Sequence, residues 1–425
     1  MAINTMVKKE SPQIHNFFDK LCQQSVFDNF LKYVEFQRNI LKNKNTMYCA
    51  VFSNGQYIVP TAPAPLLSVN LDITTACNHA CTFCVDSGVT NNGQAFTLAV
   101  VLKTIDTLTE NGLRSVILIG GGEPTLHPDF VEIVRYIKWK QLQLGIVSNG
   151  TQPEKLLQVA PSMKKNDYMR FSLDAGVDET YLKIHNPKGK GNSLKDVLCL
   201  AKEIKIKNRD VSLGYSFIIC WDGITFDGGG QVPENIGEIP QAYQNCLDYN
   251  FDYLSLKPCL VKHPEKPVET IHDDMPGKCI SEVCFEIQTQ IRLAEQLVVK
   301  NIPIVQSINL RGMLANDLDR LRSQPKICHA GFFRQVITPF GVYHCPAYRD
   351  SEVALIGDAL GYASQEAANS SYKKTTDLLM HFDAGIGCKD IACFYNEFNH
   401  SIQNLIDSDM NPRMIENKPD QEFFF

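Results

Sequence analysis

The chain has 425 residues, 44% hydrophobic and 9% aromatic, which is enough apolar material for a large core in two or three domains. Its 41 Lys and Arg residues are outnumbered by 47 Asp and Glu residues, and the net charge of -6 argues against nucleic acid as a partner. The N-terminus lacks a long apolar core, contains Glu10 and Asp19, and no run of about 18 apolar residues follows, so we expect a cytoplasmic protein without a membrane segment.

Residues 1–60 are expected to form a helical N-terminal segment. Apolar residues recur at three- and four-residue intervals over residues 17–41, the period of an amphipathic helix. We expect this segment to pack against the barrel predicted below. Recognition of a peptide or partner protein is the alternative.

From residue 66 onward, short apolar runs alternate with helical segments such as residues 98–111 and 130–139, the pattern of parallel βα units. Six such units predict the α/β fold class, as a partial, open (β/α)6 TIM-like barrel, where eight would give a full one. The predicted strands are residues 66–74, 115–120, 144–150, 168–176, 211–219 and 251–257.

Cysteine-rich, glycine-rich and polar motifs coincide with the ends of the first four strands. They are Cys77, Cys81 and Cys84, then GGGEP (120–124), SNG (148–150), and a fourth strand with Ser172 and Asp174. Functional loops of parallel α/β folds lie at the carboxyl ends of strands, so these motifs should line one mouth. Three thiolates leave one position of a four-ligand metal centre for another molecule.

These motifs, in this order, resemble the radical S-adenosylmethionine (SAM) enzymes over roughly residues 66–260. The resemblance implies a 4Fe-4S cluster held by Cys77, Cys81 and Cys84, whose fourth iron is chelated by the amino and carboxylate groups of SAM. It implies that one electron from the cluster cleaves SAM to a 5'-deoxyadenosyl radical that abstracts a substrate hydrogen. A reductant such as ferredoxin or flavodoxin would then be a partner.

The resemblance also assigns contacts to SAM. Gly121, Gly122 and Glu123 would present backbone groups to the methionine amino group, since glycine allows close approach. Ser172 and Asp174 suit hydrogen bonds to ribose hydroxyls or to the methionine carboxylate.

Further cofactor contacts have plainer alternatives. Phe83 would shield the cluster and pack near the adenine, or fill the core. Asn149 is a cofactor candidate or a turn cap. Lys183 would supply a cation for the methionine carboxylate, with Lys188 and Lys257 in reserve, although exposed lysines are usually only solvated.

A second cysteine group follows, in which two cysteines bracket a predicted hairpin turning at residues 339–341. The hairpin resembles the start of the SPASM or Twitch extension, which implies an auxiliary iron-sulfur cluster. Three residues separate Gly341 from the next cysteine where four are usual, and only two cysteines follow, which favours the one-cluster Twitch form. The expected ligands are Cys328, Cys345, Cys388 and Cys393. A structural zinc on the same thiolates is the alternative, and Cys279 and Cys284 are reserve ligands.

The expected domains are the helical N-terminal segment (1–60), a radical SAM core (61–265), a helical bridge (266–320) containing a helix over residues 282–300, an auxiliary-cluster domain (321–405) and a tail (406–425). The tail is either frayed or tucked over a groove.

The resemblance implies two substrate classes: peptides, which such enzymes crosslink, epimerise or excise residues from, and small sugars or other polar metabolites. The glycine-rich residues 220–240 would cover the mouth, and Cys220 or Cys259 would return a hydrogen atom to a substrate radical, or be buried and inert. A non-catalytic iron-sulfur electron-transfer protein is the alternative of another class, but it has no use for GGGEP. No cobalamin-binding domain is apparent.

Overall fold

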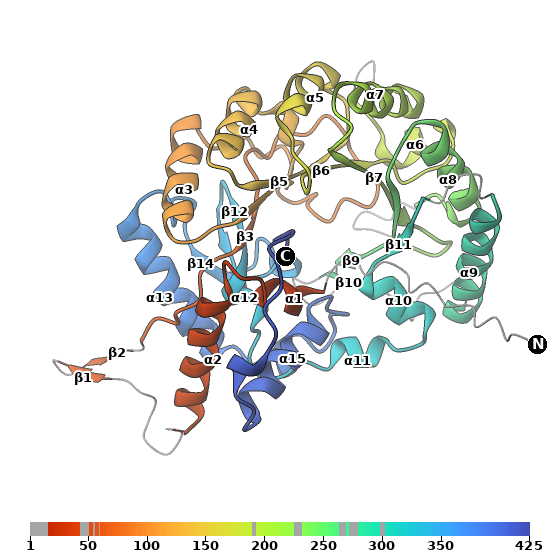
Figure 1. Ribbon diagram of the computed structural model, residues 1–425. Coiled ribbons are helices and arrows are strands. Elements are labelled where there is room, and N and C mark those ends of the chain that lie inside the picture. Colours follow the sequence, from red (N-terminus) through yellow and green to blue (C-terminus); the bar gives the residue numbers. More distant parts are fainter. Residues whose placement is uncertain are drawn as a thin grey trace, which may run out of the picture.

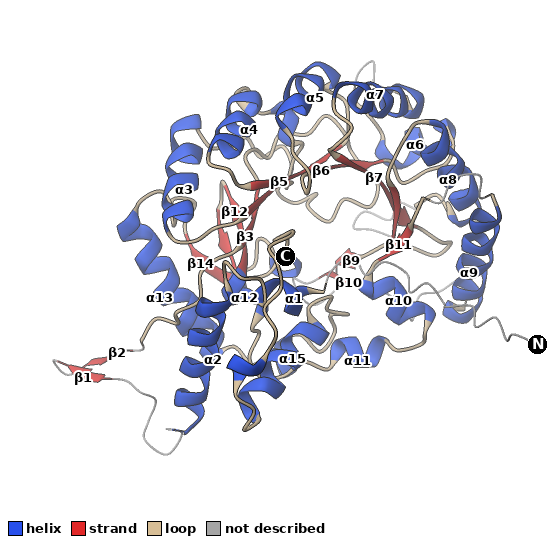
Figure 2. Ribbon diagram, viewed as in Figure 1, coloured by secondary structure: helices blue, strands red, loops and turns tan. Residues whose placement is uncertain are grey.

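One large sheet organises the chain. The computed structural model describes residues 16–42, 51–53, 56–58, 60–188, 193–224, 232–262, 269–271, 279–297 and 302–425. The sheet has ten strands among these residues, and in Figure 2 they form a curved wall with helices on its outer side. Their order across the sheet is β11 (Ile304–Gln306), β8 (Tyr253–Pro258), β7 (Ser212–Ile219), β6 (Tyr168–Ser172), β5 (Gln143–Ser148), β4 (Ser115–Leu118), β3 (Ser68–Leu71), β12 (Arg334–Thr338), β13 (Gly341–Tyr343) and β14 (Leu355–Gly357).

The six predicted strands are β3 to β8, and every neighbouring pair of them is parallel. Helices between them bury apolar faces against the outer surface of the sheet, so the predicted βα units are confirmed. These helices are α3 (Leu98–Glu110), α4 (Phe130–Trp139), α5 (Pro153–Val159), α6 (Asp178–His185), α7 (Leu194–Lys207) and α8 (Ile239–Asp248).

The parallel part of the sheet is larger than predicted. β11 pairs parallel with β8 at one edge, and β12 pairs parallel with β3 at the other, with Arg334 opposite Ser68. Eight described strands are therefore parallel, and two come from segments predicted to be a helical bridge and a separate extension. The sheet therefore runs across those predicted boundaries. The sequence does not predict this, because β11 has only three residues and β12 pairs with a strand that is distant in the chain.

The predicted hairpin between Cys328 and Cys345 is confirmed. β12 and β13 are antiparallel, with Thr338 paired to Gly341 across the turn. After β8, the other described strands of the C-terminal half are β11, β14 and the short pair β9 (Val261–Lys262) and β10 (Glu269–Thr270), and the remaining described elements are helices. Those helices are α9 (Ile280–Gln296), α10 (Ile308–Leu314), α11 (Leu318–Arg322), α12 (Ala330–Phe333), α13 (Gln365–His381), α14 (Ala384–Gly387) and α15 (Asn396–Asp407). No described helix is long and apolar enough to cross a membrane.

The N-terminal segment differs from the expectation in two ways. It is two helices, α1 (Phe17–Leu21) and α2 (Phe27–Lys42), followed by a hairpin of β1 (Val51–Ser53) and β2 (Gln56–Ile58). The helices share a core chiefly with α12 and α15 of the C-terminal half. The expected packing against the barrel holds in part, since Leu67, just before β3, belongs to the same core and the guanidinium of Arg114 donates to the carbonyl of Ser25 at 3.3 Å. An amphipathic pattern shows that one helix face is buried, but not which partner buries it.

The C-terminal tail is tucked against the amino ends of the barrel strands, and the C-terminus lies inside the ring of helices in Figure 1. The hydroxyl of Ser115 donates to the carbonyl of Phe423 at 2.9 Å, and the rings of Phe424 and Tyr168 lie 4.9 Å apart. Because Ser115 and Tyr168 begin β4 and β6, the tail covers the end of the barrel opposite to the predicted mouth.

Candidate functional site

The three cysteines lie in the loop that leaves the carboxyl end of β3, and each is partly exposed. The backbone N–H groups of Ala80 and Thr82 donate to carbonyls at the end of α6, with N···O distances of 3.1 Å to His185 and 2.9 Å to Ile184. The N–H of Cys77 donates to Oδ1 of Asn91 at 2.8 Å. Helix α6 therefore fixes the backbone between the cysteines, although it lies about a hundred residues further along the chain.

The thiols of this loop are close enough to influence one another. Burial is the main reason why the pKa of Cys77 is raised to about 11 and that of Cys81 is raised well above its ordinary value, and the neighbouring thiols raise both further. A cationic metal centre would offset this cost of deprotonation. The loop is held by α6 and Asn91 and carries three neighbouring thiols. This arrangement fits a cluster that needs three protein ligands.

The glycine-rich segment after β4 lies directly on the start of this loop. A Cβ on Gly122 would come within 2.6 Å of the carbonyl oxygen of Ala76, and the N–H of Glu123 donates to the same carbonyl at 2.8 Å. The N–H of Gly121 donates to Oδ2 of Asp72 at 3.2 Å. Only glycine fits at position 122, and the two motifs form one surface, as the sequence predicts.

The carboxylate of Glu123 joins three motifs and is buried. It accepts hydrogen bonds from Thr125, from the Ser148 hydroxyl at 2.8 Å and from the Asn149 N–H at 2.7 Å. Nδ2 of Asn149 donates in turn to Oδ1 of Asn78 in the cysteine loop at 2.9 Å. These side chains hold the mouth together, and the backbone N–H of Glu123 is already bonded to Ala76, so the predicted backbone contact of Glu123 with SAM stays a prediction.

Asp174 lies just beyond β6 in a left-handed conformation with φ of 52°, which is uncommon for residues other than glycine. Its Oδ1 accepts from the Ile218 N–H at 2.7 Å, and burial raises its pKa to about 7. Ser172 ends β6 and is partly buried. Phe83 is buried, with its ring 6.2 Å from that of His185. The cofactor contacts assigned to these residues stay predictions.

The three candidate lysines lie in different places. Lys183 is on the exposed side of α6, paired with Glu179 at 2.7 Å, so the structure does not bring it to the mouth. The helix turns His185 inward instead. The backbone N–H of Lys188 donates to Asn78 at 2.9 Å, beside the cysteine loop. Lys257 is partly buried on β8, and burial lowers its pKa to about 7.

Cys220 and Cys259 lie side by side just after β7 and β8. Both are buried; the thiol of Cys220 donates to the carbonyl of Ile218 at 3.9 Å, and that of Cys259 donates to the carbonyl of Leu260 at 3.8 Å. Burial and the neighbouring thiol raise the pKa of Cys220. Return of a hydrogen atom by either residue stays a prediction. Of the loop predicted to cover the mouth, residues 225–231 lie outside the described residues.

Sequence reasoning missed a largely buried ion triad that ties the C-terminal extension to this site. Nη1 of Arg349 lies 2.6 Å from Oδ2 of Asp86, and its Nε lies 3.3 Å from Oδ2 of Asp72. Asp86 follows the last cysteine of the loop, and Asp72 holds Gly121. No local signal marks Arg349, because 263 residues separate it from Asp86.

The four cysteines of the predicted auxiliary site line one cavity. Burial raises the pKa of Cys328, Cys388 and Cys393, and Cys345 lies close enough to raise the last two further. The cavity is also lined by Arg334, His344 and Tyr395. The reserve ligands Cys279 and Cys284 are not among its lining residues and lie at the start of α9.

Two features of this cavity bear on its ligand. Nε and Nη1 of Arg334 are buried without a hydrogen-bond partner among the described residues, so the cavity presents a cation to whatever fills it. In the described part of the chain, the one group of three His, Cys, Asp or Glu residues with ligand atoms within 4.8 Å of one another is His79, Cys81 and His185. No three of the four auxiliary sulfurs are that close.

Comparison with known proteins places these motifs in a family. Residues 71–228 match the Radical SAM superfamily. The chain is 33% identical over 135 residues to an S-adenosylmethionine-dependent nucleotide dehydratase of Selenomonas ruminantium, covering 32% of this chain and 47% of the relative. The match therefore spans about half of that protein.

Solved structures with a similar fold extend further along the chain. SuiB of Streptococcus suis, bound to precursor peptide SuiA, superposes with a TM-score of 0.51 over 73% of this chain and 67% of SuiB, at 13% identity. Histidine-tagged anSMEcpe with bound AdoMet gives a TM-score of 0.50 over 80% of this chain and 96% of that one, at 14% identity. The fold is thus the partial barrel of this superfamily with a C-terminal region added.

Proposed function

Since residues 71–228 match the Radical SAM superfamily, we propose that this chain is a radical SAM enzyme that abstracts a hydrogen atom from a peptide substrate and thereby modifies the peptide covalently. The observation that carries the peptide assignment is the likeness to SuiB in complex with its precursor peptide, which covers most of this chain. That likeness covers 73% of this chain, whereas the match to the sequence relative covers 32%.

The proposed cofactors are a 4Fe-4S cluster on Cys77, Cys81 and Cys84, and SAM. Together they supply a 5'-deoxyadenosyl radical when bound. The chain's own part is to bind and orient. Helix α6 and Asn91 hold the cysteine loop, Gly122 lets the glycine-rich segment lie against it, and the buried triad of Arg349 holds both from the extension.

We also propose that the second cavity binds an auxiliary iron-sulfur cluster on Cys328, Cys345, Cys388 and Cys393. The hairpin between Cys328 and Cys345 and the neighbouring match to the Radical SAM superfamily favour a cluster over a structural zinc on the same thiolates. The unpaired guanidinium nitrogens of Arg334 would stabilise the negative charge of a thiolate-bound cluster.

A small-molecule substrate is the second candidate. The relative from Selenomonas ruminantium is named a nucleotide dehydratase, and a protein of Thermococcus kodakarensis, 26% identical over 48% of this chain, is named a probable GTP 3',8-cyclase. The two candidates differ in which molecule loses hydrogen.

The experiment that separates them follows deuterium. The enzyme, loaded with iron and sulfide, would be supplied with SAM, a reductant and either perdeuterated precursor-type peptides encoded beside its gene or deuterated nucleoside triphosphates. Deuterium in 5'-deoxyadenosine from the peptide alone supports the proposal. Deuterium from the nucleotide alone overturns it.

A further inference from the structure

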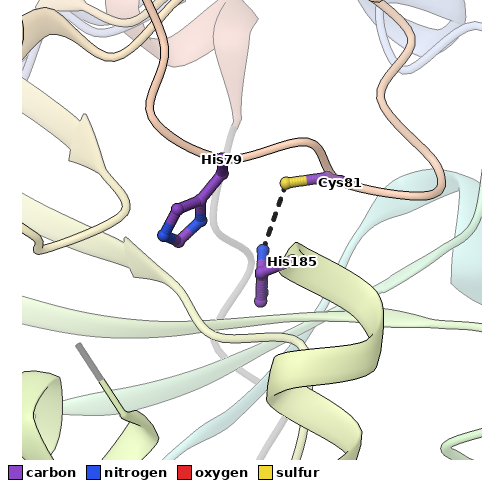
Figure 3. A group of neighbouring side chains, drawn as sticks. All are labelled: His79, Cys81 and His185. Atoms are coloured by element: carbon purple, nitrogen blue, oxygen red, sulfur yellow. Dashed lines mark hydrogen bonds between the residues drawn. The ribbon is translucent and has the colours of Figure 1, made fainter. Parts of the chain in front are cut away.

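Two buried histidines lie beside one cysteine of the loop, in an arrangement that the cluster proposal does not use. His79 and Cys81 extend from the loop, and His185 extends from the end of α6 (Figure 3). Their ligand atoms lie within 4.8 Å of one another. His79 is 2% exposed and His185 is 1% exposed, so neither imidazole is placed there for contact with water.

The hydrogen bonds of His185 fix which nitrogen faces the cysteine as a ligand. Its Nε2 lies 3.0 Å from the carbonyl oxygen of Leu173 and 3.4 Å from a carboxylate oxygen of Asp174. A carbonyl oxygen can only accept, so Nε2 carries the proton and Nδ1 keeps its lone pair. That lone pair faces Sγ of Cys81 across 3.3 Å. Metal-binding histidines are commonly held in this way, with the second nitrogen on a carbonyl or carboxylate.

His79 provides an independent observation. Neither of its ring nitrogens has a hydrogen-bond partner among the described residues, although the side chain is buried. Buried polar atoms nearly always have a hydrogen-bond partner, because leaving such an atom without one destabilises the folded state. Its ring lies 5.4 Å from that of His185, so a ligand shared by the two rings would satisfy it.

We propose that His79, Cys81 and His185 bind one divalent zinc-type metal ion in protein that has not received its iron-sulfur cluster. Two imidazole nitrogens and one thiolate are a common zinc ligand set that leaves the fourth position open. For zinc bonds of about 2.0 to 2.3 Å, nitrogen and sulfur ligands lie about 3.6 Å apart, close to the separation of His185 and Cys81. The thiol of Cys81 releases its proton to solvent as the ion binds.

The inference goes beyond the proposed function and does not depend on the substrate. Because Cys81 belongs to both ligand sets, the ion and the cluster exclude each other at this loop. Zinc bound here therefore blocks cluster assembly until it is removed, and it satisfies His79 in the meantime.

The test uses the full chain prepared without iron and sulfide, with zinc as the probe and zinc per chain as the readout. The auxiliary cysteines can also hold zinc, so the wild type should bind two equivalents. His79→Ala and His185→Ala should each bind one. Cys84→Ala is the matched control, because it removes a cluster ligand and leaves the three proposed ligands in place, and it should still bind two.

Cobalt in place of zinc gives a second readout that does not depend on stoichiometry. The proposed site predicts nitrogen and sulfur ligands in its X-ray absorption spectrum, and circular dichroism checks that each variant is folded. The proposal is overturned if Cys84→Ala loses an equivalent while both histidine variants keep it, because the metal would then sit on the three thiols. The proposal is also overturned if the wild type binds only one zinc per chain and the folded His185→Ala variant binds the same amount. Cluster loading with iron and sulfide is a separate measurement, so the zinc proposal can fail while the proposed function is upheld, and the reverse.

Discussion

The guanidinium of Arg349 lies 2.6 Å from the carboxylate of Asp86 and thereby ties the C-terminal extension to the loop that carries Cys84. Its side chain is 9% exposed, and it also reaches Asp72, which holds the backbone of Gly121. One buried cation from the extension thus positions both the cysteine loop and the glycine-rich segment. Through this contact the extension helps to position the cysteine loop after β3, independently of what binds in the auxiliary cavity.

Replacing Arg349 by Ala should weaken SAM binding by at least about tenfold, since the buried Asp72 and the half-buried Asp86 lose their cation and the loop is no longer held. Breaking a buried pair should also lower the free energy of unfolding by about 3 kcal/mol. SAM affinity would be measured by equilibrium binding to the loaded protein, and Arg349→Lys should restore part of it. The exposed Arg320→Ala is the control. Unchanged affinity in Arg349→Ala would remove this positioning role.

Asp72 should make stability fall as pH rises from about 4 to about 7. Burial raises its pKa to about 7 in the folded chain, above the ordinary value of 3.8, despite the opposing charge of Arg349. Between those values the folded state holds a proton that the unfolded state has released, so raising the pH favours unfolding by up to about 1.4 kcal/mol per pH unit. Denaturant unfolding of Asp72→Asn against pH should lack this fall. An identical pH profile in the variant would show that Asp72 does not titrate in this range.

The carboxylate of Glu123 should contribute mainly to the stability of the folded chain. Replacing it by Ala leaves the donors of Thr125, Ser148 and Asn149 without their shared acceptor, which should lower the free energy of unfolding by about 2 to 4 kcal/mol. Urea unfolding measures this, with the exposed Glu132→Ala as the control. Equal losses in the two variants would contradict the buried network.

The auxiliary cavity predicts a loss of iron that spares the first site. Cys328→Ala or Cys388→Ala should lower the iron content by about four per chain while 5'-deoxyadenosine is still formed from SAM. Iron and sulfide analysis of the loaded variants gives the number. Unchanged iron, or zinc in the wild-type cavity after loading, would refute the auxiliary cluster.

Local patterns sufficed for much of this account. The strands from β3 to β8, the hairpin of Gly341 and the meeting of the cysteine loop with GGGEP follow from apolar periodicity and from the rule that loops gather at strand ends. Even the four auxiliary cysteines, from two distant stretches, line one cavity as expected.

What the sequence could not show depends on contacts between distant residues. The pairing of β12 with β3 and the triad of Arg349 leave no local trace, because each partner is ordinary in its own surroundings. Its charge favours Lys183 as a cofactor contact in the sequence, whereas the helical phase turns His185 inward. His79 is a potential ligand that the sequence shows directly, inside the cysteine motif itself.

The most direct test of the central claim is anaerobic loading with iron and sulfide, followed by addition of SAM and dithionite and assay of 5'-deoxyadenosine. The account predicts about eight irons per chain and formation of the product, and no product from Cys77→Ala, Cys81→Ala or Cys84→Ala. Product formation by any of these three variants, or none from a fully loaded and reducible wild type supplied with its substrate, would contradict it.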